Sequence, residues 1–316
     1  MFNTEIIHFL QSFDYPWLHS FMEFISALGL VPIILGFVLG ICFAFDFRKG
    51  LVLINIVAWT ALATVTLKQN IDFPRPPDVD LTIQSGFSES VAFDLTDKQP
   101  QGFFETFSEE VLSKTRNDEF KRYGFPSGHT SIQVALWLSV ILLFRKKWAY
   151  FLGSSIIILT MISRMYLGYH FLGDILGGLA IGLIISLALL RYIKNSKFYT
   201  KRAHNFKSLS FLGFPLLLIP FAFFFSPTLL GGIIGINAAA ILQLQLMNVP
   251  VNNGFGFQRA ITAAIGIVIY LIGFYLPRLV GIPIEGFLGT LITAILSFAS
   301  FFGALALCRR LNLIRS

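Results

Sequence analysis

Three short stretches of this 316-residue sequence place charged residues, histidines and glycine beside long apolar runs. Charged groups next to segments that can cross a membrane are costly to keep there, so they are functional candidates by default. The stretches hold Lys68, Arg75 and Pro76; then Pro126, Ser127, Gly128 and His129; then Ser163, Arg164, His170 and Asp174.

The chemistry that these residue types suit is the capture and transfer of a phosphate group. Lys68, Arg75 and Arg164 offer positive charge to a phosphate dianion, and arginine can bind it through two parallel hydrogen bonds. Ser127 and Gly128 open a predicted helix, whose first backbone N–H groups and positive dipole end favour an anion. The sequence therefore predicts a phosphate site built from cationic side chains and a helix start.

A nucleophile and a proton donor stand in the same stretches. His170 and Asp174 are four residues apart at the start of a predicted helix, so they lie on one helical face. The carboxylate can keep one imidazole nitrogen protonated, which leaves the other nitrogen to act as a nucleophile. His129 is then suited to protonate the leaving oxygen.

Each residue also has a simpler explanation when it is taken alone. Lys68 at the end of an apolar run is typical of an anchor whose charged head reaches the membrane interface. Ser127 before a helix is typical of a cap, and Asp174 can simply pair with a nearby arginine. The joint order and spacing of the three stretches favour the catalytic interpretation over these separate ones.

The pattern Lys-x6-Arg-Pro, Pro-Ser-Gly-His and Ser-Arg-x5-His-x3-Asp resembles the three-part signature of the type 2 phosphatidic acid phosphatase superfamily. That family includes membrane lipid phosphatases, glucose-6-phosphatase and the soluble vanadium haloperoxidases. The resemblance covers roughly residues 20–192, the six-helix core of the family, and leaves residues 209–316 without a counterpart.

The resemblance implies a role for each residue of the signature. His170 attacks phosphorus and forms a phosphohistidine, Asp174 orients it, and His129 protonates the leaving alcohol and then activates water. The residues implied to bind the phosphate oxygens are Lys68, Arg75, Ser127, Gly128 and Arg164. The scheme uses no metal and no other cofactor, because the cations neutralise the charge that Mg²⁺ neutralises in other phosphoryl transfers.

The composition places these residues in a membrane protein. Apolar residues make up 55% of the chain and charged residues only 13%, against about 25% charged residues in an average soluble domain. The mean hydropathy of +0.73 excludes a soluble, a disordered and a disulfide-stapled secreted chain. Cys42 and Cys308 lie inside apolar runs, so we expect them to be packing residues rather than a disulfide.

The expected fold class is all-α, a polytopic bundle of about nine membrane spans, because one helical span needs about 20 mostly apolar residues. Such stretches lie at 20–45, 50–67, 127–144, 148–165, 170–191, 209–226, 229–247, 260–280 and 287–308. The expected division is an interfacial amphipathic helix at 1–19, a phosphatase core at 20–192 with an extracytoplasmic loop at 68–126, a basic cytoplasmic loop at 193–208, and a transmembrane extension at 209–316. The amphipathic first 18 residues lack the pattern of a cleavable signal peptide.

The basic residues predict the orientation of these spans. The basic clusters that follow alternate spans fall on one side of a nine-span chain, and the positive-inside rule makes that side cytoplasmic. The same excess explains the net charge of +7 without a nucleic-acid partner. The three chemical stretches then lie on the opposite face. We expect an integral protein of a bacterial inner membrane with a periplasmic site and a cytoplasmic C-terminus; an endoplasmic reticulum membrane with a lumenal site fits the same rules.

Two features outside the signature carry separate predictions. Residues 102–115 have an apolar stripe that includes Phe103, Phe104 and Phe107, which predicts a short amphipathic helix that either packs on the span ends or forms a lid at the headgroup level. In the C-terminal extension, small and polar residues predict helix packing or a homo-oligomer rather than substrate selection. These residues are Gly231, Gly232, Gly235, Asn237, Gln243 and Gln245.

The sequence therefore predicts a hydrolase acting on a phosphate monoester, or a pyrophosphate, of a lipid at the outer face of the bilayer. Phosphatidate, a polyprenyl pyrophosphate, a lipid A phosphate and a sphingoid phosphate all remain open as substrates. One alternative is a phosphotransferase that passes the phosphohistidine's group to another lipid. A second is a non-catalytic transporter or scaffold, which would not require His129, His170 and Asp174 together.

Overall fold

The computed structural model of the chain describes residues 1–86, 98–100, 102–116, 123–196, 198, 206–246 and 254–314. Within these residues every regular element is helical, and no strand occurs. The predicted all-α class is therefore confirmed. The chain forms two compact units, one of Met1–Leu30 with Ala63–Ser186 and one of Val31–Leu62 with Leu187–Ser316.

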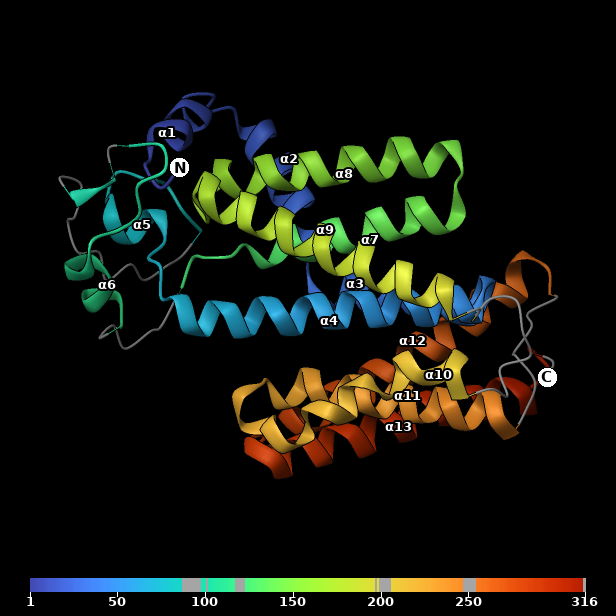
Figure 1. The fold of residues 1–316 in the computed structure, drawn as a ribbon. Helices are drawn as coiled ribbons and strands as arrows, with labels where there is room; N and C mark the ends of the chain where they lie inside the picture. Colours follow the sequence, from blue (N-terminus) through green and yellow to red (C-terminus); the bar gives the residue numbers. More distant parts are fainter. Residues whose placement is uncertain are drawn as a thin grey trace. The chain divides into compact units, whose positions relative to one another are not determined.

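The first unit contains the segments that hold the chemical signature (Figure 1). Its helices are α1 (Glu5–Gln11), α2 (Pro16–Ala27), α5 (Pro76–Val79), α6 (Glu109–Arg116), α7 (Gly128–Phe144) and α8 (Lys147–Tyr166), with the later part of α4 (Phe47–Ile71) and the earlier part of α9 (Leu172–Asn195). The second unit contains α3 (Val31–Gly40), a π-helical turn (Ile41–Phe45), α10 (Phe206–Gly213), a 3-10 helix (Phe214–Phe224), α11 (Pro227–Leu246), α12 (Gly256–Leu279) and α13 (Gly286–Arg310), with the remainder of α4 and α9.

Where the structure describes them, the nine predicted apolar stretches lie mainly on helices, but not all as single straight spans. Among the described residues, six helical segments are long and apolar enough to cross a membrane, and the bent pair Pro16–Ala27 and Val31–Phe45 makes a seventh if it is one span. Helix α7 and the segment Leu209–Phe224 are shorter. The stretch 20–45 is interrupted between Ala27 and Val31, where Gly29 and Pro32 disfavour a continuous helix. The stretch 209–226 tightens into a 3-10 helix that is kinked after Pro220, because proline donates no helical hydrogen bond.

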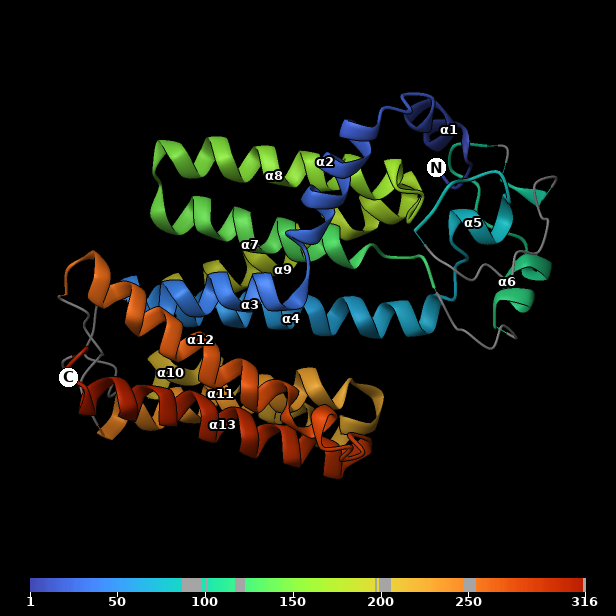
Figure 2. The same cartoon turned by 180° about the vertical axis from the view of Figure 1, so that it is seen from behind.

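Three helices of the first unit bring the second and third parts of the signature together. The connected helices α7 and α8 run side by side, and α2 passes along α8 (Figure 2). Helix α9 packs closely on the start of α7 because two of its glycines have no side chain. A Cβ atom at Gly178 would lie 2.6 Å from the Ser127 carbonyl oxygen, and one at Gly182 would lie 2.7 Å from the Ser131 carbonyl oxygen.

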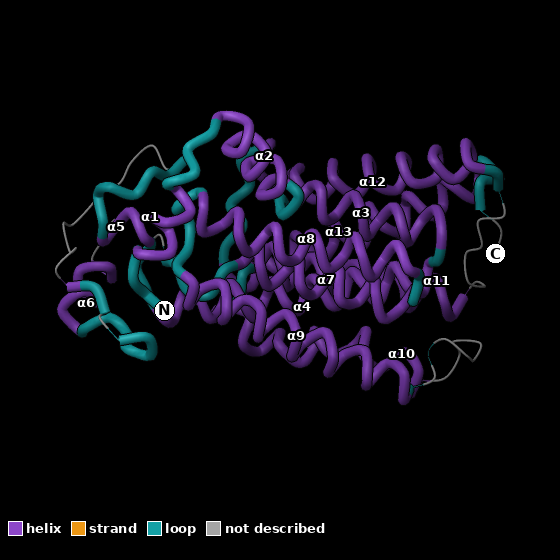
Figure 3. Tube along the Cα trace, turned by 90° about the horizontal axis from the view of Figure 1, so that it is seen from above, coloured by secondary structure: helices purple, strands orange, loops and turns teal. Residues whose placement is uncertain are grey.

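The end of the first unit near the N-terminus is covered by α1, α5 and α6 (Figure 3). Aromatic and aliphatic side chains form a buried core beneath them, including Phe2, Ile7, Phe107, Val111 and Phe171. This cluster ties the first residues of the chain to the loop between α5 and α7.

The amphipathic helix predicted at 102–115 is shorter than expected. Glu105 accepts a hydrogen bond from the Gly102 amide at 2.8 Å, which closes a turn before α6 begins at Glu109. Phe107 packs in the buried core, whereas Phe103 and Phe104 are exposed and contact each other edge to face. The packing interpretation therefore holds for the later part of the stripe, and a lid role remains a prediction for the two exposed rings.

In the second unit, close packing occurs where the sequence predicted it. A Cβ atom at Gly231 would lie 2.4 Å from the Thr290 carbonyl oxygen, and one at Gly235 would lie 2.2 Å from that of Ala294, so α11 and α13 approach through small residues. Asn237 on α11 exchanges amide hydrogen bonds with Asn55 on α4, at 2.8 and 2.9 Å.

Candidate active site

A cavity of about 480 Å³ in the first unit is lined by residues from all three signature stretches. In the sequence, Pro126 comes 50 positions after Pro76, and Ser163 comes 34 positions after His129. The fold joins the three stretches at the end of α4, the start of α7 and the connection between α8 and α9. The predicted residues that line the cavity are Lys68, Arg75, Gly128, His129, Arg164 and His170.

The connection between α8 and α9 holds His170 at this cavity. Gly168 has a φ of +67°, a left-handed conformation that glycine adopts without strain, and it turns the chain after α8. A Cβ atom there would lie 2.5 Å from the Gln84 carbonyl oxygen, so the neighbouring loop also requires glycine. His170 follows two residues later and is buried, with only 2% of its surface exposed.

Asp174 fixes the orientation of the His170 ring. Its Oδ2 atom lies 3.1 Å from His170 Nδ1 and accepts a hydrogen bond from the Phe171 amide at 3.0 Å. With Nδ1 occupied as a donor to the carboxylate, Nε2 is the ring nitrogen left for chemistry in the cavity. Burial, reinforced by the positive charges of Lys68, Arg75 and Arg164, holds the pKa of His170 well below its usual range. The imidazole is therefore neutral at physiological pH, and Nε2 keeps a free lone pair.

Arg164 is held in place by two residues that the sequence interpretation missed. Its Nη1 atom donates a hydrogen bond to Ser26 Oγ at 2.5 Å, and its guanidinium carbon lies 4.1 Å from the centre of the Tyr169 ring. Stacking and a directed hydrogen bond fix a guanidinium in one plane. Tyr169 lies inside the third stretch and was therefore open to prediction, whereas Ser26 is 138 residues away with no local signal.

His129 lies against the backbone that follows α2. A Cβ atom at Gly29 would stand 2.3 Å from Cδ2 of His129, so the ring occupies the space that any larger residue would fill. Gly29 is a further residue that the sequence interpretation missed. Its importance becomes visible only when the fold places the end of α2 at the cavity.

Ser127 and Asp174 lie beneath the cavity rather than on its lining. The Ser127 amide donates to the Asp174 carbonyl oxygen at 3.0 Å, and its Oγ accepts a hydrogen bond from Thr130 at 3.1 Å. Ser127 therefore joins the start of α7 to the start of α9. The amides of Gly128, His129 and Thr130 follow in the first helical turn, where no earlier turn supplies an acceptor. Direct phosphate binding by Ser127 stays a prediction.

Most of the charged groups on the lining are cations. In the described part of the chain, no three His, Cys, Asp or Glu side chains gather in a way that would hold a metal ion. Of the residues that the structure describes, Lys68, Arg75 and Arg164 line this cavity together with one carboxylate, that of Glu23. The arrangement suits a dianionic group bound beside the His170 imidazole.

Residues 49–198 match the sequence model of the PAP2 superfamily. This segment belongs to the PAP2 superfamily. The segment includes every residue of the signature, from Lys68 to Asp174, so the predicted family is confirmed.

Two curated relatives are similar to parts of the chain. Phosphatidylglycerophosphatase B of Bacillus subtilis is 29% identical over 184 residues, which cover 54% of this chain and 72% of that protein. Lipid A 4'-phosphatase of Porphyromonas gingivalis is 42% identical over 64 residues, so the match spans only 27% of that protein's length and 20% of this chain.

One solved structure is also similar to the chain. It is a transmembrane PAP2-type phosphatidylglycerolphosphate phosphatase from Bacillus subtilis, 23% identical, and the match covers 63% of this chain and 86% of that one. The TM-score is 0.43.

Proposed function

We propose that this PAP2 protein is a membrane-integral phosphatase that hydrolyses a phosphate monoester or pyrophosphate on a lipid through a phosphohistidine at His170. The observation that carries the proposal is the buried His170–Asp174 pair at a cavity lined by Lys68, Arg75 and Arg164. A binding protein or transporter needs the cations, but it does not need an oriented neutral imidazole beside them.

In the first step the bound phosphate is transferred to the enzyme. His170 Nε2 attacks phosphorus while the bond from phosphorus to the leaving oxygen breaks, and His129 gives that oxygen its proton. The His170 Nδ1 proton stays with the imidazole, hydrogen-bonded to Asp174. Lys68, Arg75 and Arg164 stabilise the charge on the non-bridging oxygens.

In the second step the phosphoenzyme is hydrolysed. His129, now neutral, accepts a proton from water, whose oxygen attacks phosphorus as the bond from phosphorus to Nε2 breaks. Inorganic phosphate leaves and the starting protonation state is restored. If a lipid alcohol takes the place of water, the same intermediate gives a phosphotransferase, which is the alternative function.

The two relatives support phosphorylated lipids as the candidate substrates. The names of the two relatives specify phosphatidylglycerophosphate and the 4'-phosphate of lipid A. Both are phosphate monoesters on a lipid, which is the substrate class that the cationic cavity favours. Phosphatidate, a sphingoid phosphate and a polyprenyl pyrophosphate belong in the same comparison.

The proposed setting is a bacterial inner membrane, with the site on the periplasmic face and the C-terminus in the cytoplasm. It rests on the apolar helices and on the distribution of Lys and Arg. Single cysteines at Ser85 and at Ser196, in a chain without Cys42 and Cys308, should react with impermeant reagents from opposite sides. Reaction of both from the outside would contradict this orientation.

The experiment that tests the function is phosphate release by detergent-solubilised protein from a panel of pure lipids. We expect release from at least one lipid phosphate, inhibition by vanadate, and full activity in EDTA. Strict dependence on added Mg²⁺ would contradict the proposed charge neutralisation by arginine and lysine. A phosphotransferase would instead form a phosphorylated lipid when a lipid alcohol is present and would release free phosphate only when that alcohol is absent.

A further inference from the structure

The connection from α8 to α9, which carries His170, is held at both ends by residues 1–13 of the chain. Gln11 bonds to the end of α8, and Phe2 packs against the start of α9. These residues lie outside the segment 49–198 that matches the PAP2 superfamily. Part of the support of the proposed nucleophile therefore comes from a segment that the three signature stretches do not contain.

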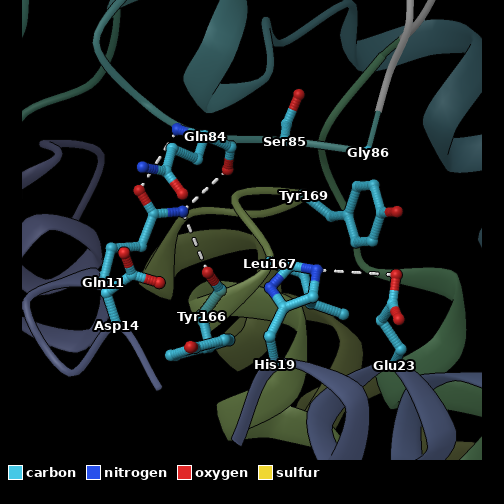
Figure 4. Close-up of a pocket in the computed structure, with 10 residues that line it drawn as sticks. All are labelled: Gln11, Asp14, His19, Glu23, Gln84, Ser85, Gly86, Tyr166, Leu167 and Tyr169. Atoms are coloured by element: carbon cyan, nitrogen blue, oxygen red, sulfur yellow. Dashed lines mark hydrogen bonds and ion pairs between the residues drawn. The ribbon is translucent and has the colours of Figure 1, made fainter. Parts of the chain in front are cut away.

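Gln11 holds the end of α8 through both ends of its side-chain amide. Its Nε2 atom donates to the Tyr166 carbonyl oxygen at 2.9 Å and to that of Gln84 at 2.7 Å (Figure 4). Its Oε1 atom accepts a hydrogen bond from the Gln84 amide at 3.2 Å. The Tyr166 hydroxyl group donates to the Phe13 carbonyl oxygen at 3.2 Å. Because the Nε2 group has only two hydrogens, these bonds use both of them and fix the amide plane.

Phe2 packs against the start of α9. A Cβ atom at Gly173 would lie 2.3 Å from Cζ of Phe2, so the ring fills the space that a side chain there would need. Its centre lies 6.2 Å from the centre of the Phe171 ring, which is completely buried. The Gly173 amide also donates to the Met1 carbonyl oxygen at 3.1 Å. The first turn of α9, which carries Asp174, is therefore supported by the N-terminal residues.

The same ring of Phe2 pairs with an aromatic residue in or beside each of the other two stretches. Phe73, two positions before Arg75, lies 5.1 Å from it between ring centres, at an angle of 87°. Phe125, two positions before Ser127, lies 6.3 Å away at an angle of 62°. Edge-to-face pairs have a preferred geometry, so they constrain where each ring can lie. One side chain outside the signature therefore packs against all three stretches.

The relative position of the three stretches decides whether phosphoryl transfer can occur. His170 must approach phosphorus opposite the leaving oxygen while Lys68 and Arg75 bind the other oxygens. A displacement of about 1 Å, even one caused far from the reacting atoms, can lower a rate about 100-fold. Because a packed interior has few voids, neighbours shift when a ring is removed from it.

We propose that residues 1–13 hold the proposed catalytic groups in register, and that Phe2 and Gln11 are positioning residues for His170. The inference rests on the proposed function, which makes His170 the nucleophile. Phe2 and Gln11 lie outside the described lining of the cavity that holds the proposed phosphate site, so they act through the turn and not on the substrate. This role is in addition to the interfacial location predicted for residues 1–19.

Two substitutions in the full, detergent-solubilised chain each remove one of these contacts. Phe2→Leu removes the ring and keeps an apolar side chain, whereas Gln11→Met removes the amide and keeps a side chain of similar length. We expect each variant to lower kcat about 10- to 100-fold and to change KM less than about twofold, because the groups that bind phosphate remain. The factor should be the same for a lipid phosphate and for p-nitrophenyl phosphate. A loss confined to the lipid, or a change in KM alone, would overturn the inference.

A ring buried elsewhere provides the matched control. Phe211 in the second unit is also almost fully buried, and its ring centre lies 5.0 Å from that of Phe198. Phe211→Leu should lower the thermal midpoint as Phe2→Leu does, but it should leave kcat per folded protein unchanged. An equal loss of kcat in both variants would show that general destabilisation, and not the position of His170, is responsible, and would overturn the inference.

Inhibition by vanadate supplies a readout that lost stability alone does not change. Vanadate can adopt the five-coordinate geometry of the transition state, so its tight binding requires His170 and the cations in register. Its inhibition constant should rise by the same factor as kcat falls in Phe2→Leu and Gln11→Met, and it should not change in Phe211→Leu. An inhibition constant that stays at the wild-type value in all three variants would contradict a positioning role.

The outcomes separate this inference from the proposed function. If Phe2→Leu and Gln11→Met keep the wild-type kcat while phosphate release still requires His170, the positioning role is wrong and the hydrolase proposal stands. If the wild-type protein hydrolyses no phosphate ester, the proposed function fails, and the positioning role fails with it.

Discussion

His170 Nδ1 and Asp174 Oδ2 lie 3.1 Å apart, inside a unit where neither residue exposes more than 2% of its surface. The same carboxylate oxygen accepts a hydrogen bond from the Phe171 amide, which holds the carboxylate in place beside the imidazole. This pair leaves Nε2 as the ring nitrogen available in the cavity, and in the proposed mechanism Asp174 positions the ring rather than contacting the substrate.

Asp174→Asn should lower kcat by a factor of about 100 to 10,000, because an amide can present either an oxygen or an NH₂ group to Nδ1 and so permits the wrong tautomer. KM should change little, since Asp174 does not line the cavity. Steady-state kinetics on the best lipid phosphate of the panel, with circular dichroism to check folding, measure both effects. A change in KM alone would assign Asp174 to substrate binding.

Gly29→Ala should impair the proton donor without touching the phosphate. The new Cβ atom would stand 2.3 Å from His129 Cδ2, so the imidazole must move. We expect kcat to fall about 10- to 100-fold, less than the about 100- to 10,000-fold that general acid–base catalysis contributes, because the histidine is displaced rather than removed. Gly36→Ala on α3 is the matched control, since a Cβ atom there meets nothing within 4 Å. An equal loss of kcat in both variants would show that Gly29 is not required for the placement of His129.

The amides of Asn55 and Asn237 should stabilise the second unit as a pair. Each donates to the other, at 2.9 and 2.8 Å, and both side chains are buried. Replacing either one with alanine leaves a buried amide without its partner and should cost about 1–3 kcal/mol in the free energy of unfolding in detergent. The double variant should cost clearly less than the sum of the two. Additive losses of unfolding free energy would mean that the two amides act separately. Asn70→Ala removes an exposed amide and is the control.

Asp80 makes stability depend on pH at the end of the first unit near the N-terminus. Thr82, His8 and Thr4 hydrogen-bond to its buried carboxylate and hold its pKa below the usual range despite burial. Because the pKa is lower in the folded state, the ionised carboxylate stabilises the fold at pH values above its ordinary pKa of about 3.9. This stabilisation is lost as the pH falls below about 3.9 toward the folded-state pKa. The contribution should therefore shrink by about 1 kcal/mol between pH 7 and pH 3.

The thermal midpoints of the wild-type protein and of Asp80→Asn measure this contribution. The gap between them should be wide at pH 7 and narrower at pH 3. A gap of constant width would show that the Asp80 charge does not stabilise the folded unit.

The chemical signature could be predicted because it consists of local patterns of fixed spacing. The i, i+4 spacing of His170 and Asp174 predicted their contact, and the apolar runs predicted the helices. Ser26 and Gly29 could not be predicted, since their roles depend on where α2 passes after the chain folds. The early start expected for the helix at 102–115 was wrong because the Glu105 side chain favours a local turn over the helix.

The central claim is that phosphate passes through His170, and trapping the phosphoenzyme tests it most directly. Protein quenched in alkali during turnover of a labelled lipid phosphate, then digested and examined by mass spectrometry, should carry an acid-labile phosphate on His170. The label should be absent from His170→Ala, which should also release no phosphate while remaining folded. Phosphate on another residue, or turnover that survives His170→Ala, would contradict the account.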